Sequence, residues 1–125
     1  MTSKKRCLLS MKNDKIYLRH ILDAISDIEK FIIGVSEEDF SKNREKQYAV
    51  LRGLEIIGEA SKNLSDELKA KCPGIDWKNI AGMRDKLIHA YFGVNLPLVW
   101  ETVKNDLPQL KKQAQNLLKD LNNSS

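Results

Sequence analysis

Apolar residues recur at steps of three or four positions along most of this chain, and this periodicity restricts its fold more than any other feature. The clearest run lies in the first third, where Tyr17, Ile21, Ala24 and Ile28 would share one side of a helix. Such spacing is typical of amphipathic helices, whose buried side repeats about every 3.6 residues. No stretch shows the strict apolar–polar alternation of a half-buried strand. The pattern therefore predicts an all-α protein.

The apolar stripes suffice for four main helices, which we expect to pack as an up-and-down bundle with one or two short helices between them. A length of 125 residues suits a single domain. Residues 1–10 are expected to be a flexible basic arm, residues 11–121 the helical domain, and residues 122–125 a frayed tail.

The limits of the main helices follow from their stripes and from the glycines and prolines between them. The first is expected over about residues 11–34 and the second over about residues 44–70. The third carries Arg84. The last follows Asn95 and should kink at Pro108, because a proline inside a helix has no N–H to donate.

Short-range signals predict the smaller elements. Ser36 begins a stretch that looks like a capping box, which opens a short helix. Asp76 is a candidate N-cap for another short helix, and Asn95 can cap the last one. Gly53 and Gly58 each lower helix propensity by about 1 kcal/mol relative to alanine. Glycines inside a long helix indicate that a second helix approaches closely.

Composition limits the function classes. The net charge is +4 and the pI about 9.1, which is compatible with an acidic partner, and part of the excess lies in residues 4–6. Cys7 and Cys72 are expected to be free thiols in the cytoplasm. No apolar run approaches the roughly 18 residues that span a bilayer. With His20 and His89 as the only histidines, neither a metal site nor a cofactor is expected.

One stretch, from Ala81 to Gly93, combines residue types that handle phosphate and protons. Arg84 is a permanent cation whose planar donors suit phosphate oxygens. His89 titrates near neutral pH and can act as a general acid or base. Together they could cleave RNA without a metal, with His89 taking the proton of a 2′-hydroxyl and Arg84 stabilising charge on the phosphate.

Helical geometry adds two expectations for this stretch. Asp85 and His89 are four residues apart and share a face, so Asp85 could support the imidazole. Arg84 and His89 diverge by roughly 140° around the axis. A cleft between two copies of the chain would let both face one substrate, which predicts a homodimer. By itself Arg-x4-His is a short pattern, and a histidine beside Leu87 and Ile88 is more often a packing or surface residue.

The longer pattern Arg84-x4-His89-x-Tyr91 resembles the motif of the HepT-like ribonuclease toxins, members of the HEPN superfamily. The segments 54–60 (LEIIGEA), 73–77 (PGIDW) and 99–100 (VW) are similar to that family too, and the likeness covers roughly residues 12–112. The chain departs from the family at Tyr48, where members often carry an acidic residue.

The resemblance implies a HEPN-type helical bundle that forms a dimer, with two motifs lining one groove. It implies a metal-independent endoribonuclease, the toxin of a toxin–antitoxin pair, with Arg84 and His89 as catalytic residues. The antitoxin of such pairs is a minimal nucleotidyltransferase (MNT type), and the resemblance implies that it transfers AMP to Tyr91. A non-catalytic HEPN module that binds nucleotide, RNA or its partner protein is the alternative, and a purely structural helical dimer is a third.

Overall fold

The structure is a computed structural model, and it describes residues 3–82, 85 and 95–123. Within these ranges the segments with apolar periodicity form helices. No strand occurs among these residues, so the predicted all-α class is confirmed. The expected third main helix, around Arg84, lies outside the described residues except for Asp85, and the four-helix arrangement stays a prediction. The elements in chain order are α1 (Ser3–Ile32), α2 (Glu37–Lys42), α3 (Arg44–Lys62), α4 (Asp66–Ala70), α5 (Trp77–Ala81), α7 (Leu96–Glu101), η1 (Thr102–Asp106) and α8 (Leu107–Asn123).

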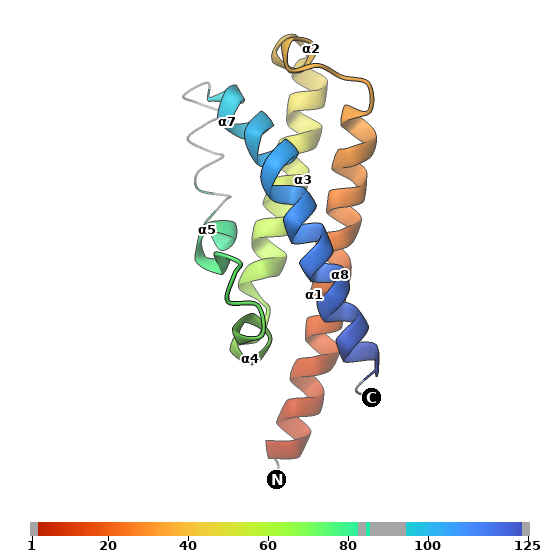
Figure 1. The fold of residues 1–125 in the computed structure, drawn as a ribbon, viewed down its shortest axis with the longest axis vertical. Helices are drawn as coiled ribbons and strands as arrows, with labels where there is room; N and C mark the ends of the chain where they lie inside the picture. The colour runs from red at the N-terminus through yellow and green to blue at the C-terminus, as the bar shows by residue number, and fades with distance from the viewer. Residues whose placement is uncertain (1–2, 83–84, 86–94, 124–125) are drawn as a thin grey trace.

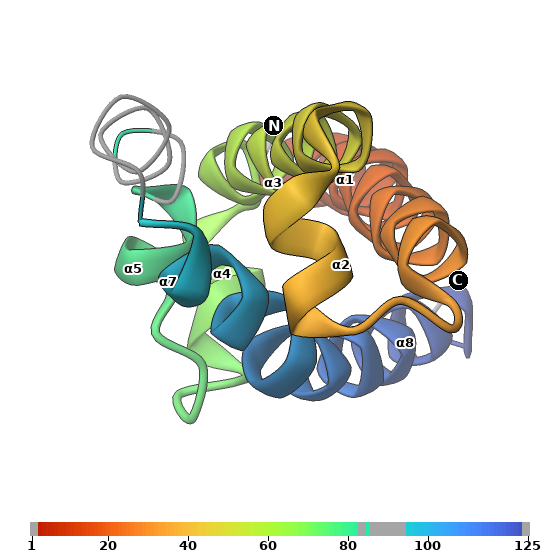
Figure 2. The ribbon, with the colours of Figure 1, turned by 90° about the horizontal axis from the view of Figure 1, so that it is seen from above.

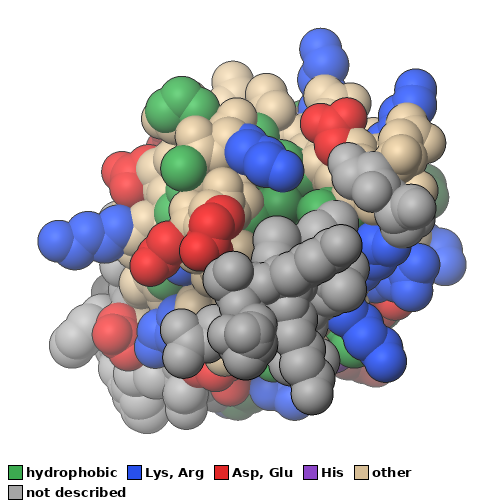
Figure 3. Space-filling view, turned by 90° about the horizontal axis from the view of Figure 1, so that it is seen from below, with side chains coloured by type: hydrophobic (Ala, Val, Ile, Leu, Met, Phe, Trp, Pro, Cys, Tyr) green, Lys and Arg blue, Asp and Glu red, His purple; other side chains and the backbone are tan. Residues whose placement is uncertain are grey.

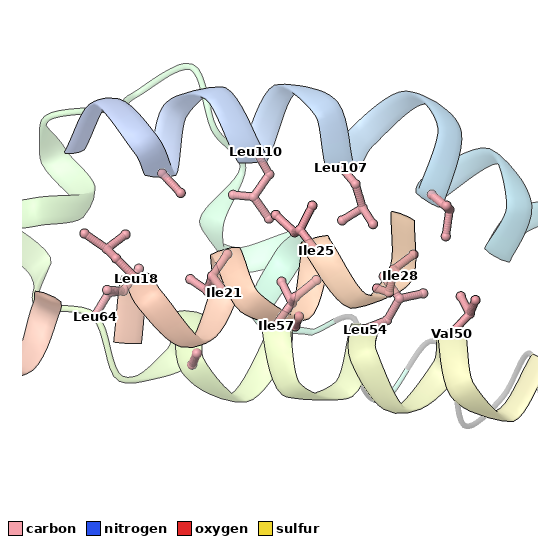
Figure 4. Close-up of a cluster of buried hydrophobic side chains, with 14 of the residues drawn as sticks. Leu18, Ile21, Ile25, Ile28, Val50, Leu54, Ile57, Leu64, Leu107 and Leu110 are labelled. Atoms are coloured by element: carbon pink, nitrogen blue, oxygen red, sulfur yellow. The ribbon is translucent and has the colours of Figure 1, made fainter. Parts of the chain in front are cut away.

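The core lies where α1, α3 and α8 meet along their lengths (Figures 1 and 4). Each helix contributes the apolar stripe that its spacing predicts, and the side chains of the three stripes point toward one another. Burial of these side chains supplies the main stabilisation of the fold. Labelled members of this cluster in Figure 4 are Leu18, Ile21, Ile25 and Ile28 from α1, Val50, Leu54 and Ile57 from α3, Leu64 from the turn after α3, and Leu107 and Leu110 from α8.

Gly53 lets α1 and α3 approach closely. A Cβ atom at this position would lie 2.7 Å from Cγ1 and 2.8 Å from Cδ1 of Ile28, distances that real Cβ atoms essentially never show. The predicted reason for a glycine inside α3 is therefore confirmed at Gly53. Gly58, on the same helix, is buried. At the end of α1, Gly34 has a φ of 70°, the left-handed conformation that commonly ends a helix.

Two helix limits differ from the sequence predictions. α1 begins at Ser3, whereas the pattern predicted a start near Met11. The single helix predicted over residues 44–70 is wrong, because α3 ends at Lys62 and Ser65 caps a new helix, α4. Asn63 ends α3, and the Ser65 hydroxyl caps α4 by accepting the N–H of Leu68. The buried carboxylate of Asp14 in α1 adds hydrogen bonds from the backbone N–H of Ser65 (2.8 Å) and from its hydroxyl (2.6 Å).

The continuous helical segment formed by α7, η1 and α8 is irregular one turn before Pro108, where a kink was expected. η1 is a π-helical turn between α7 and α8, in which the N–H of Leu107 donates to the carbonyl of Thr102, five residues earlier. Pro108 follows in the first turn of α8, where its missing N–H is tolerated. Two four-residue steps, from Val99 to Val103 to Leu107, would rotate an ordinary helical stripe by roughly 80°. The π-turn keeps all three side chains buried.

Candidate functional site

The motif predicted to carry the chemistry lies between α5 and α7. Arg84, His89 and Tyr91 are outside the described residues, and their geometry therefore stays a prediction. Asp85 is described and its side chain is exposed. The structure describes α5, which precedes the motif segment, and α7, which follows it. These two helices and the contacts that hold them are called the frame of the motif.

α5 leads into the motif and is held at both ends. Asp76 caps it as predicted, because its Oδ1 accepts the N–H of Asn79 at 3.0 Å. The indole N–H of Trp77 donates to the carbonyl of Lys69 at 3.2 Å, which fixes α5 to α4. The N–H of Gly82 donates to the carbonyl of Lys78 at 2.9 Å, and α5 ends there, two residues before Arg84.

α7 receives the chain after the motif. Asn95 caps it as predicted, accepting the N–H of Leu98 at 3.3 Å. Trp100 packs on the buried ring of Phe40 in α2, with ring centroids 5.3 Å apart, and the ammonium of Lys104 lies 5.0 Å from the indole centroid. The far end of the motif segment is therefore anchored to α2 through aromatic contact, a link that sequence spacing did not indicate.

Helix α3 lies between α1 and the two helices that flank the motif segment (Figure 2). Seen from above, α1 lies on one side of α3, and α5 and α7 lie on the other (Figure 2). α5 packs directly against α3. The helix before the motif segment therefore packs on α3, and the helix after it packs on α2 and η1.

The outer side of α3 also borders a shallow hollow of about 190 Å³, shared with α1. The Glu55 carboxylate, on its rim, pairs with Arg52 at 3.3 Å. Glu59 is half-buried there. The His20 ring is exposed, lines the same hollow and meets the Tyr17 ring edge-on at 6.1 Å.

The described residues outside the motif offer little nucleophilic or metal-binding chemistry. Burial, with a smaller contribution from the negative charge of Asp120, raises the pKa of the half-buried Cys72 thiol. Its sulfur contacts the side-chain oxygen of Gln113 at 3.6 Å. A thiol in such surroundings is less reactive, because the thiolate is the nucleophile. Within the described ranges, no group of three or more His, Cys, Asp or Glu is placed to hold a metal ion, and no helix could span a membrane.

Comparison with known proteins identifies a family and several relatives that the chain resembles. The family model described as "Ribonuclease HepT-like" matches residues 21–117, which include the whole motif. A protein of Thermococcus cleftensis named as a probable ribonuclease HepT is 49% identical over 108 residues, covering 86% of this chain and 98% of the relative. A candidate RNase of Caldanaerobacter subterraneus is 48% identical over 108 residues, covering 86% and 96% respectively.

A third relative, from Methanocaldococcus jannaschii, is 48% identical over 110 residues, or 88% of this chain and 50% of the relative. Its name joins a gamma-glutamylcyclotransferase to a candidate RNase. No solved structure matches the chain.

Proposed function

This chain belongs to the HepT-like ribonuclease family, and on that basis we propose that it is a metal-independent endoribonuclease acting through Arg84 and His89. The observation that carries the proposal is the motif Arg84-x4-His89-x-Tyr91, which lies inside the matched region of the family. The family and the names of its relatives support ribonuclease activity. The roles of single residues rest on the chemistry of the motif.

In the proposed reaction the 2′-hydroxyl of the RNA attacks the neighbouring phosphorus, and the bond from phosphorus to the 5′-oxygen breaks. His89 accepts the hydroxyl proton or, as imidazolium, protonates the departing 5′-oxygen. Arg84 stabilises the negative charge that develops on the phosphate oxygens. Asp85, one helical turn before His89, would orient the imidazole. The products carry a 2′,3′-cyclic phosphate and a 5′-hydroxyl.

The proposed active form is a homodimer. Arg84 and His89 diverge around a helix, so two copies can supply both groups to one groove more easily than a single chain. A dimer of this kind would place two motifs beside the same substrate.

The proposed biological role is the toxin of a HEPN/MNT toxin–antitoxin pair. The antitoxin nucleotidyltransferase would transfer AMP from ATP to the Tyr91 hydroxyl, with release of pyrophosphate. The added group brings bulk and negative charge into the groove, where it would obstruct RNA and repel its backbone.

The deciding experiment is cleavage of a long RNA in EDTA by the purified, unmodified protein beside His89→Ala. Loss of a general acid or base costs about 10²- to 10⁴-fold in rate, so the variant should be inactive on the same time scale. A strand with 2′-O-methyl groups should resist cleavage, because it lacks the attacking hydroxyl. Equal activity of parent and variant would point to a contaminating nuclease and refute the assignment.

The non-catalytic alternative has a distinct outcome. If neither protein cleaves, while the intact mass shows no added nucleotide and Arg84→Ala weakens RNA binding, the chain is a binding module. If Arg84→Ala instead binds RNA as the parent does and neither protein cleaves, the motif contributes surface charge alone.

A further inference from the structure

The positive charge of the chain is concentrated in the first part of α1. Residues 1–22 contain six Lys or Arg and one acidic residue, Asp14, whereas residues 23–125 contain 15 Lys or Arg and 16 Asp or Glu. The first 22 residues therefore carry a formal charge of +5 and the rest of the chain −1. The excess that makes the protein basic lies in one segment.

This segment includes the end of α1 that extends beyond the bundle. The first turns of α1 reach past α4 and past the end of α8 (Figure 1). Viewed from this end, several Lys and Arg side chains lie on the described surface, most closely together at one edge (Figure 3). The segment that carries the excess charge thus includes an end of α1 that projects from the bundle (Figure 1).

Within the described side chains of α1, three cations form a stripe: Lys12, Lys15 and Arg19. Their spacing places them in a sector of roughly 60° that spans about 10 Å along the helix. Lys12 and Arg19 are exposed and Lys15 is half-buried. The described residues hold none of the three in an ion pair or a hydrogen bond.

The nearby carboxylates do not neutralise this stripe. Asp14 points into the fold, where it is 3% exposed and bound to Ser65. Asp66 and Glu67, in the first turn of α4, form no ion pair with the stripe among the described residues. Asp23, one turn after Arg19, marks the point at which the exposed side of α1 becomes mixed in charge.

We propose that the basic stripe of α1 is an auxiliary RNA-binding surface, which contacts the phosphate backbone of substrates that extend beyond the cleavage site. This inference rests on the proposed ribonuclease function, which makes RNA the acidic partner. An anionic membrane fits less well, because the apolar stripe of α1 that follows residue 17 is buried in the core and is not free to insert.

The separation of the stripe from the motif sets the expected effect. The stripe lies on α1, whereas α5 and α7, the helices before and after the motif segment, lie on the other side of α3 (Figure 2). A strand of a few nucleotides bound at the motif would not reach both places, whereas a longer RNA could. The stripe should therefore raise affinity for long RNA and leave the turnover of short RNA unchanged.

The test compares two triple variants of equal net charge. The first is Lys12→Gln/Lys15→Gln/Arg19→Gln, and the matched control is Lys30→Gln/Lys42→Gln/Lys112→Gln, which removes three exposed cations elsewhere. Binding to a labelled single-stranded RNA of 30 nucleotides is measured by fluorescence anisotropy across a salt series. Each protein also carries His89→Ala so that the RNA stays intact.

Each phosphate contact contributes about 0.7 to the salt slope for single strands, or roughly 5-fold in affinity at 0.1 M salt. The stripe variant should therefore bind roughly 100-fold more weakly, with a slope shallower by about 2. The control should change by only a few-fold, through the long-range effect of net charge. Equal losses in the two triples, or no loss in the stripe variant, would overturn the inference.

Two further measurements separate this inference from the function on which it rests. With His89 restored, the stripe variant should cleave a tetranucleotide at the parent rate and a long RNA with a raised KM. Parental cleavage of both substrates would refute the auxiliary surface while leaving the nuclease intact. Loss of vesicle binding (30% phosphatidylserine in phosphatidylcholine) with unchanged RNA affinity would assign the stripe to a membrane instead. Weakened RNA binding by a protein that never cleaves would keep the surface and refute the nuclease.

Discussion

The contact between Asp14 and Ser65 should control both stability and the position of the motif, and Asp14→Ala tests this. The carboxylate is 3% exposed and accepts two hydrogen bonds from Ser65. The Ser65 hydroxyl oxygen in turn accepts the N–H of Leu68 at 3.2 Å and so caps α4. α4 then holds Trp77 through the carbonyl of Lys69. One carboxylate therefore orders the path from α1 to α5, the helix that leads into the motif.

The expected loss can be worked from these contacts. Hydrogen bonds to a charged group are worth about 1.5–3 kcal/mol each, and the alanine variant leaves the buried N–H of Ser65 without its acceptor. Removing Asp14 also removes the cost of burying a carboxylate, which offsets part of the loss. We expect a net destabilisation of about 3 kcal/mol, which lowers the Tm by roughly 12 °C for a domain of this size.

The assay is urea unfolding of Asp14→Ala, Ser65→Ala and the double variant. Ser65→Ala should cost about 2 kcal/mol, from a lost cap and a lost hydrogen bond to the carboxylate. Because both variants break the same contacts, the double variant should cost at least 1 kcal/mol less than the sum of the two. Additive losses, or a loss below about 0.5 kcal/mol for Asp14→Ala, would refute the proposed linkage.

Other contacts give independent predictions. Gly53→Ala should destabilise the protein by about 1 kcal/mol, because the clash with Ile28 exceeds the gain in helix propensity. Urea unfolding of this variant, with and without Ile28→Ala, should show that the effects of the two substitutions are coupled. Ser61→Ala should raise the unfolding free energy by up to about 1 kcal/mol, since the buried Ser61 hydroxyl has no hydrogen-bond partner among the described residues; a loss would argue against this. Cys72 should react with iodoacetamide at pH 8 more slowly than free cysteine, because its pKa is raised, and Asp120→Asn should speed the reaction, as peptide mass mapping can follow.

Local chemistry predicted much of the fold. Helical periodicity identified the buried stripes of α1 and α3, and residues such as Leu54 lie in the core as expected. The caps at Ser36, Asp76 and Asn95 were predicted because a capping side chain binds an N–H only three residues away. The prediction that another helix approaches closely at Gly53 was correct, because a Cβ atom there would clash with Ile28.

Long-range contacts account for what the sequence did not predict. The cap at Ser65 was a local signal that the sequence analysis overlooked, but its contact with Asp14, 51 residues earlier, could not be predicted from any local pattern. Trp77 and Trp100 were visible as apolar residues, but their partners, Lys69 and Phe40, became known only from the packing. The same limit applies to the candidate site: its residue types could be chosen from the motif, whereas the frame around the motif required the folded structure.

The π-turn before α8 has a consequence for how this helix can change in length. A π-turn holds one residue more than an ordinary helical turn, so it is equivalent to a single-residue insertion that the helix has absorbed. Deleting one exposed residue of η1, such as Asn105, would let the turn relax to α-helical geometry while α7 and α8 keep their present faces. Removal of this one residue is therefore expected to leave the core intact, with α7 and α8 still joined as a continuous helix.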